Sequence, residues 1–263
     1  MNKRIAALLL AVACSGSAPG GGSEALQSRE PAAAPGLSGL WQKAVDIQRR
    51  NHDWYPERIS VLSEVLNRRS EPYSVTQLYF SLHLGADGRL RTELTRALKN
   101  GKDTTEKMKS KVTISNPKEG PDTEGGNTYS VSISDSPFNP ERQEAVSFNA
   151  SGEKKLLFGH LCQRFEFTYQ TTIVSKGQRE KLTWSGMAWL EARSGMPVKL
   201  EFSLAPLPSR IRSLWAIYLY DTARPDKWVL NKITISGRGG FLFITKRFRS
   251  TTTFSQYRRA PQK

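Results

Sequence analysis

Residues 186–200 read GMAWLEARSGMPVKL, and this stretch decides the fold. Before its centre, apolar residues occupy alternate positions: Leu182, Trp184, Gly186, Ala188 and Leu190. After it they alternate with polar residues: Val198, Leu200, Phe202 and Leu204. Between the two runs, Ser194-Gly195-Met196-Pro197 is composed mainly of turn-forming residues. A period of two on both sides of a turn predicts two paired antiparallel strands that share one buried face.

The same alternation recurs along most of the chain. Leu78 to Leu84 alternate with polar residues and are followed by Asp87-Gly88 and a second short run, which is a strong hairpin signal. Further strands are expected at 129–133, 165–169, 214–220, 228–235 and 241–248. About nine to eleven strands without interleaved helices favour one large antiparallel sheet, curled or nearly closed. They argue against a βαβ nucleotide-binding fold.

The predicted helices lie mostly before the strands. Apolar residues at 40, 41, 44, 45 and 47 predict a helix over 37–50, and those at 59, 62, 65 and 66 predict a second over 57–69. The polar segments 99–127 and 134–155 are expected to be long loops, with a short helix at Asn139-Pro140. The predicted fold class is therefore mainly β with N-terminal helices, in which helices cap an unclosed β-barrel.

The N-terminus has the features of an export signal. Lys3 and Arg4 precede an apolar run, 5–13, that is too short to span a bilayer. The run ends at Cys14, and small residues before a cysteine resemble the lipobox of bacterial lipoproteins, in which the thiol receives diacylglycerol. The alternative is an ordinary signal cleaved after Ala13 or Ala18. We expect a signal peptide at 1–13, a lipidated Cys14 with a flexible tether over 14–36, and a single domain over 37–263.

The chain is strongly basic. Its 263 residues include 39 Lys and Arg against 24 Asp and Glu, so its formal charge is +15 and it should favour anionic partners. With 38% hydrophobic residues, disorder along the whole chain is excluded. The export signal argues against a nucleic acid partner. We expect anionic lipid headgroups to contact a cationic set near the C-terminus: Lys246, Arg247, Arg249, Arg258 and Arg259. A plain solvated face is the alternative.

Signatures of catalysis are scarce. The sequence has no nucleophile elbow, no phosphate-binding loop and no zinc-protease motif, and its two cysteines exclude a four-cysteine zinc site. His160 and Cys162 would share one face of a strand, where the imidazole could activate the thiol. An envelope hydrolase that uses this pair is the weakest of our hypotheses. A buried, inert Cys162 is the favoured interpretation. We expect no enzyme activity, no metal and no cofactor.

The strands carry many bulky rings. Such side chains either fill the interior of a curled sheet or line an apolar cavity for a ligand such as an acyl chain. The residues that we predict to line a cavity are Leu78, Phe80, Phe165, Phe167, Trp184, Phe202, Trp215 and Trp228.

Residues 186–200, the Trp228 strand, Phe241-Leu242-Phe243 and Phe254-Ser255-Gln256-Tyr257 together resemble the outer-membrane lipoprotein-sorting proteins, the LolA/LolB-like superfamily. The resemblance covers about residues 155–258. It implies an unclosed β-barrel, capped by helices, that binds lipid or lipoprotein acyl chains. No arginine here matches the family's cavity arginine. Because of the expected anchor and the two polar insertions, the resemblance favours a fixed receptor or accessory role over soluble shuttling.

These observations predict an outer-membrane lipoprotein that faces the periplasm and binds an acyl chain during envelope trafficking. The alternative is a non-enzymatic interaction module of the same fold with a filled core, whose loops dock to another envelope protein.

Overall fold

A computed structural model describes residues 35–51, 53–85, 90–110, 136–175, 178–207, 211–224, 227–241 and 244–260. Several predicted features lie outside these ranges: the signal at 1–13, Cys14 and the tether up to residue 34, the Asp87-Gly88 turn, the polar segment 111–127 and the strand at 129–133.

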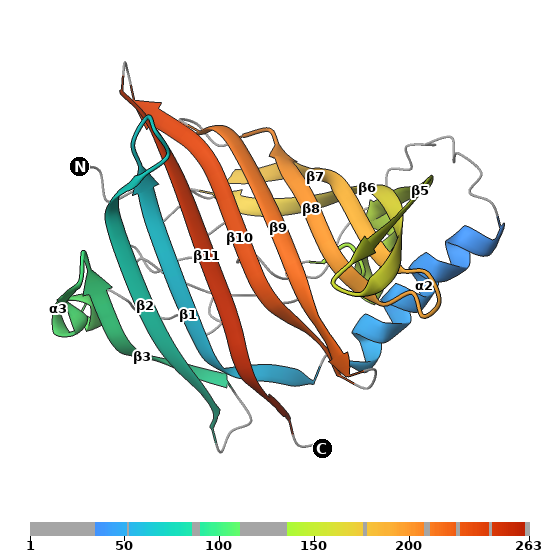
Figure 1. Ribbon diagram of the computed structural model, residues 1–263, viewed down its shortest axis with the longest axis horizontal. Coiled ribbons are helices and arrows are strands. Elements are labelled where there is room, and N and C mark those ends of the chain that lie inside the picture. Colours follow the sequence, from blue (N-terminus) through green and yellow to red (C-terminus); the bar gives the residue numbers. More distant parts are fainter. Residues whose placement is uncertain are drawn as a thin grey trace.

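The described chain is dominated by strands (Figure 1). Its helical elements are α2 (Pro35–Arg50), the short α3 (Thr105–Lys109) and the 3-10 turn η1 (Pro140–Ala145). The strands are β1 (Trp54–Leu66), β2 (Pro72–Leu84), β3 (Leu90–Lys99), β4 (Lys102–Asp103), β5 (Val146–Leu157), β6 (His160–Ser175), β7 (Gln178–Glu191), β8 (Pro197–Ala205), β9 (Ile211–Arg224), β10 (Lys227–Phe241) and β11 (Ile244–Arg259). The predicted mainly β fold with a preceding helix is confirmed.

All eleven strands form one antiparallel sheet in the order β4-β3-β2-β1-β11-β10-β9-β8-β7-β6-β5. The first strand of the chain pairs with the last, as in Val61 with Thr252, and this pairing joins the β1–β4 segment to the β5–β11 segment. The two edges, β4 and β5, are not paired with each other, so the sheet is bent but unclosed.

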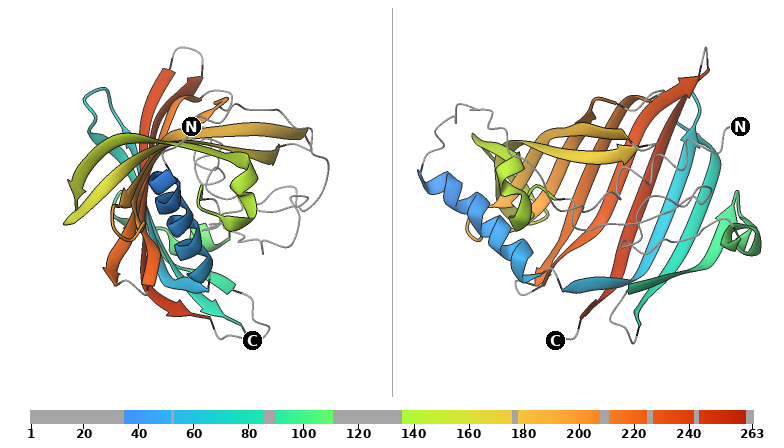
Figure 2. Two further views of the ribbon diagram at one scale, coloured as in Figure 1. Left: turned by 90° about the vertical axis from the view of Figure 1, so that its right-hand side faces the viewer. Right: turned by 180° about the vertical axis from the view of Figure 1, so that it is seen from behind.

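The two faces of the sheet differ in what covers them. We call the side that carries Ile59, Tyr218 and Phe165 the inner face, because α2 and η1 lie on that side (Figure 2). The other side, which faces the viewer in Figure 1, is the outer face. Side chains alternate between the faces along every strand because the backbone is pleated.

Helix α2 packs over the inner face of the strands β5 to β8, which we call the helix-covered half. The Trp41 ring stacks on Phe148 with centroids 4.4 Å apart, and it also contacts Phe138, Phe165 and Phe167. The Trp41 indole N–H donates to the Gln143 side chain in η1 at 3.1 Å. The helix begins at Pro35, a favoured residue in a first helical turn.

Three predictions about local structure are wrong. The segment 99–127, expected to be a loop, contains β4 and α3 in its described part. Residues 57–69, expected to be helical, belong largely to β1, because Ile59, Val61 and Val65 also fit a period of two and both neighbouring strands pair with them. The segment 134–155, expected to be a loop, contains η1 and, from Val146, strand β5. The short helix predicted at Asn139-Pro140 is confirmed as η1, where the Asn139 side chain accepts from the Glu141 N–H at 3.0 Å.

Candidate functional site

The inner face of β1, β2, β3, β10 and β11 is apolar but differs from the helix-covered half. We call it the helix-free half, because α2 and η1 lie over the other strands and, among the described helical elements, only the short α3 packs near it, against the edge strand β3. Val61 of β1 is flanked directly by Leu78 of β2 and by Thr252 of β11. The buried apolar side chains of this surface are Ile59, Val61, Leu78, Phe80, Leu94, Ala97, Ile233, Ile235, Phe248 and Phe254.

Hydroxyl side chains interrupt this apolar surface. Thr252 lies between Val61 and Ile233 in the register and is only half-buried. Ser63 and Ser250 occupy the next inner pair, with their oxygens 3.2 Å apart. The other half-buried inner hydroxyls are Ser74, Thr76 and Thr92. The surface therefore combines buried aliphatic and aromatic groups with half-buried hydroxyls, whereas the inner residues beneath α2, such as Phe165, Phe167 and Phe202, form a network of rings.

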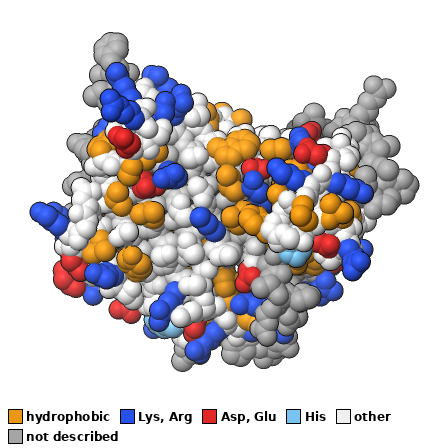
Figure 3. Space-filling model, in the orientation of Figure 1, with side chains coloured by type: hydrophobic (Ala, Val, Ile, Leu, Met, Phe, Trp, Pro, Cys, Tyr) orange, Lys and Arg blue, Asp and Glu red, His pale blue; other side chains and the backbone are white. Residues whose placement is uncertain are grey.

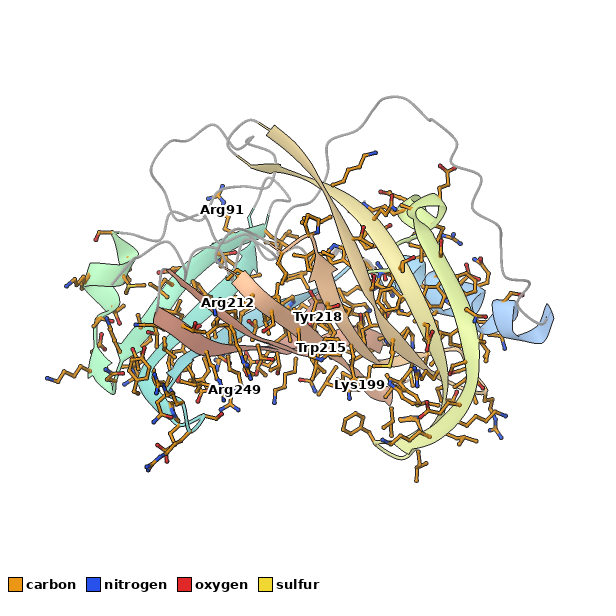
Figure 4. All side chains as sticks on the ribbon, turned by 90° about the horizontal axis from the view of Figure 1, so that it is seen from above. Arg91, Lys199, Arg212, Trp215, Tyr218 and Arg249 are labelled. Carbon is orange, nitrogen blue, oxygen red and sulfur yellow. The ribbon has the colours of Figure 1, made fainter. Side chains whose placement is uncertain are left out.

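An arginine lies at the end of the inner face. Arg212 is exposed and lies two residues before the buried Leu214 on β9, at a shift in the register with β10 that leaves it without a strand partner. In Figure 4, Arg212 and Tyr218 lie on the opposite side of the sheet from Lys199, Trp215 and Arg249. Among the described residues, no carboxylate forms an ion pair with Arg212. This position would allow the guanidinium to meet an anionic group at the edge of an apolar surface.

The predicted cavity residues fall into separate places. Phe165, Phe167, Trp184 and Phe202 belong to the ring network beneath α2, in which Trp184 and Phe202 have centroids 5.0 Å apart. Leu78 and Phe80 lie in the helix-free half.

The two remaining tryptophans are not on the helix-free surface. Trp215 lies on the outer face between Ser203 and Ser236 and is 37% exposed. Trp228 is buried, stacks on Tyr220 and donates its indole N–H to the Pro197 carbonyl at 2.8 Å.

The predicted cationic set is largely paired within the protein. Arg249 meets Glu64 at 2.6 Å, Arg258 meets Glu57 at 2.5 Å and Arg259 meets Asp53 at 2.5 Å. Lys246 lies over the Tyr73 ring, and Arg247 donates to the Ser70 hydroxyl at 3.0 Å. Blue side chains gather over the β1–β2 and β10–β11 ends at the upper left of Figure 3. Three of the five cations are therefore compensated by carboxylates that precede or belong to β1.

The His160 and Cys162 pair shows no activation of the thiol. Burial raises the pKa of Cys162 to about 11, and its S–H donates to the His160 carbonyl oxygen at 3.4 Å. Cys162 packs with Trp189 and Val198 in a small cluster separate from the main core. A raised pKa leaves too little thiolate for a nucleophile near neutral pH.

The described residues offer neither a metal site nor a membrane-spanning helix. No group of three or more His, Cys, Asp or Glu side chains there could hold a metal ion. Among the same residues, no helix is both long enough and apolar enough to cross a bilayer.

The sequence did not predict the role of the last two strands in the candidate surface. Phe248 and Phe254 share the inner face of β11, but Ser250 and Thr252 separate them, so the apolar period is broken. The useful signal was their common parity. Phe248, Ser250, Thr252 and Phe254 all have even numbers, so they lie on one face of β11. On β1 the even-numbered positions include the charged Arg58 and Glu64, which favours the odd-numbered positions as its apolar face.

Comparisons with solved structures give distant similarities. A domain named as an outer membrane lipoprotein-sorting protein domain from Vibrio parahaemolyticus is 13% identical, with a TM-score of 0.35, over 85% of this chain and 93% of that one. A DUF1329 family protein from Desulfovibrio piger is 10% identical, with a TM-score of 0.37, over 86% and 94%. The Pseudomonas aeruginosa MucA/MucB complex includes a chain 8% identical, with a TM-score of 0.22, over 86% and 99%. No protein-family model and no curated protein matches the chain.

Proposed function

We propose that this chain is a non-enzymatic lipoprotein of the bacterial outer membrane that faces the periplasm and binds an acyl chain of a lipid or lipoprotein. In this proposal the acyl chain lies on the inner face of the helix-free half, and a diacylglycerol group on Cys14 holds the protein at the membrane. The protein would take part in lipid or lipoprotein trafficking within the envelope.

The observation that carries the proposal is that the apolar inner face continues past the strands that α2 covers. Val61, Ile233 and Phe254 extend it, and the half-buried Thr252 lies among them. An acyl chain is a suitable occupant because each buried methylene contributes about 0.8 kcal/mol without requiring a directional partner. A face composed only of hydroxyls and charges would not retain such a ligand.

The position of Arg212 favours an amphiphilic ligand over a neutral hydrocarbon. The exposed guanidinium at the end of the inner face would bind a carboxylate or phosphate, while the apolar residues hold the chain. Replacing it by glutamine should weaken binding of a fatty acid more than binding of the corresponding alcohol. That difference separates recognition of a headgroup from simple partition into an apolar surface.

The ring network favours a second candidate function, that of an interaction module with a filled core. Phe202 contacts Phe167, Trp184 and Tyr218 at once, with centroid distances between 5.0 and 6.3 Å. If such packing extended through the helix-free half, there would be no place for an acyl chain. The protein would then act only by docking to another envelope protein.

The test is mass spectrometry of lipid that co-purifies with the full chain, repeated with two variants of β11. Thr252→Phe adds a ring to the inner face between Val61 and Ile233, whereas Thr253→Phe adds the same ring to the outer face between Ser60 and Lys232. We expect bound lipid in the wild type and the Thr253→Phe variant, and about a tenfold loss of it in Thr252→Phe. Recovery of lipid-free protein in all three would favour the interaction module, and equal loss in both variants would contradict the inner-face location.

A further inference from the structure

The hairpin between β5 and β6 carries an unusual group of exposed apolar side chains at its tip. Leu156 is 68% exposed, Phe158 is 68% exposed and Leu161 is 50% exposed. Leu156 and Leu161 are direct cross-strand partners one pair away from the turn. Three large apolar side chains thus gather at one end of two strands, where folding does not bury them.

The turn itself is strained at the aromatic residue. Phe158 has φ +50° and Gly159 has φ +85°, which is the left-handed region required by a two-residue turn of this kind. The turn between β3 and β4, at the other edge of the sheet, has nearly the same angles but contains Asn100 and Gly101, the preferred pair. At this position a phenylalanine costs free energy twice, because its backbone is held at a positive φ and its ring is exposed to water. Backbone strain of this kind is found at functional sites.

The tip projects from a rigid base. Leu157, on the opposite side of the strand from Leu156, packs against the cluster of Cys162, Trp189 and Val198. The Ala192 N–H donates to the Leu161 carbonyl at 2.8 Å. In Figure 2 (left), the hairpin extends away from α2 and η1, so its end stands clear of the described helices. Because the base of the hairpin is packed and hydrogen-bonded, the exposed side chains at its tip keep a fixed position relative to one another.

Two cations lie beside the tip on β5. Lys154 and Lys155 are exposed on β5 directly before the apolar residues. The nearest carboxylate in sequence, Glu153, is engaged by Arg164 at 2.5 Å, and Arg164 also meets Glu166 at 2.7 Å. Lysines beside a small apolar protrusion suit the interface of a membrane, where the protrusion enters the acyl boundary and the ammonium groups reach anionic headgroups.

We propose that the β5–β6 tip inserts into the surface of a bilayer that contains anionic lipid. The three side chains at this end are apolar and offer no hydrogen-bonding groups. They therefore fit a fluid lipid interface better than a protein surface, which requires shape and polar complementarity. This contact differs in place from the cationic set of β11, three of whose members already pair with carboxylates.

The experiment places an environment-sensitive fluorophore on the full chain in a Cys14→Ser background, in which the only other cysteine is the buried Cys162. The label is attached through Phe158→Cys at the tip or, as the control, through Ser147→Cys, an exposed position near the start of the same strand. Vesicles of phosphatidylcholine, with or without phosphatidylglycerol, are then added. Quenching by spin-labelled lipid reports depth at the label itself, whatever else holds the chain to the vesicle.

We expect the label at position 158, but not at 147, to shift to the blue and to be quenched when phosphatidylglycerol is present. Adding Leu156→Ser or Leu161→Ser should lower the apparent affinity about tenfold each. Lys154→Gln with Lys155→Gln should remove the preference for the anionic vesicles. Because these side chains are exposed, thermal melting should stay unchanged.

Two outcomes would overturn the proposal. A label at 158 that stays in water with both vesicle compositions would show that the tip does not enter lipid and would leave a protein partner as its target. Equal quenching at 158 and 147 would indicate that the whole chain adsorbs without using the tip. Neither outcome bears on acyl-chain binding at the inner face, which is measured without vesicles.

Discussion

The helix-covered half and the helix-free half are built from the same sheet but differ in how their inner faces are filled. In the first, Trp41 of α2 stacks on Phe148 and contacts Phe165, and the rings form a continuous network. In the second, aliphatic residues such as Val61 and Ile233 lie beside half-buried hydroxyls such as Thr252, and neither α2 nor η1 covers them. Both halves contribute buried residues to one core, and we assign the proposed acyl-chain site to the helix-free half because it lacks the covering ring network.

The largest expected effect is on the helix-covered half. Trp41→Ala removes a completely buried ring and its hydrogen bond to Gln143, so we expect the free energy of unfolding to fall by about 3–5 kcal/mol. Trp215→Ala, on the outer face, is the matched control and should cost less than about 1 kcal/mol. Denaturant titration measures both. Equal costs would mean that α2 does not have the stabilising role assigned to it.

The second prediction concerns the close approach of two strands in the same half. A Cβ on Gly186 would contact the Glu201 carbonyl oxygen and lie 2.5 Å from the Phe202 Cβ, so Gly186→Ala should destabilise the protein by about 2 kcal/mol. Gly39 in α2 has nothing within 4 Å of its Cβ position, so Gly39→Ala should stabilise it by up to about 1 kcal/mol. Thermal unfolding of the two variants should shift in opposite directions, and two shifts of the same sign would contradict this packing.

The third prediction compares the turns at the two edges of the sheet. Phe158→Asn should relieve the strain of a left-handed phenylalanine and raise stability by about 1 kcal/mol. The reverse change, Asn100→Phe, should lower stability, because it also removes the bond that the Asn100 side chain accepts from the Val75 N–H at 2.8 Å. Calorimetry of both variants tests the pair. A Phe158→Asn protein that melts lower would indicate that the ring contributes to the fold rather than to a contact outside it.

The smallest expected effect concerns the rate at which alkylating reagents modify the Cys162 thiol. With a pKa of about 11, roughly one thiol in a thousand is ionised at pH 8, so the folded protein should resist alkylation that the denatured protein undergoes readily. Because the thiol ionises near 9 when unfolded and near 11 when folded, its contribution to stability should be lost as pH rises through that interval. Rapid labelling of the native protein at neutral pH would revive the hydrolase hypothesis.

The sequence predicted the strongly periodic parts of the fold. The helix at 37–50, the strands on both sides of Ser194-Gly195-Met196-Pro197 and the pairing of 78–84 with 90–94 are all present. In each of these, the apolar period is unbroken and the boundaries are marked by turn formers. Local pattern was sufficient there because each element buries one uniform face.

Other parts depended on partners distant in the chain. The apolar residues of β1 fit both a helix and a strand, and pairing with β11, about 190 residues away, decides between them. Strand β5 was missed because only Val146, Phe148 and Ala150 face the core before six exposed residues follow. The tip at Leu156, Phe158 and Leu161 could not be recognised from sequence, because exposed and buried leucines look the same until the hairpin is formed.

The most direct test of the central claim is photo-crosslinking with a diazirine fatty acid, followed by mass spectrometry of the labelled peptides. We expect label in the peptides of β1, β10 and β11 that contain Val61, Ile233 and Thr252, and we expect Thr252→Phe to abolish it there. Labelling confined to the outer face around Trp215, or labelling unchanged by Thr252→Phe, would contradict an acyl chain on the inner face of the helix-free half.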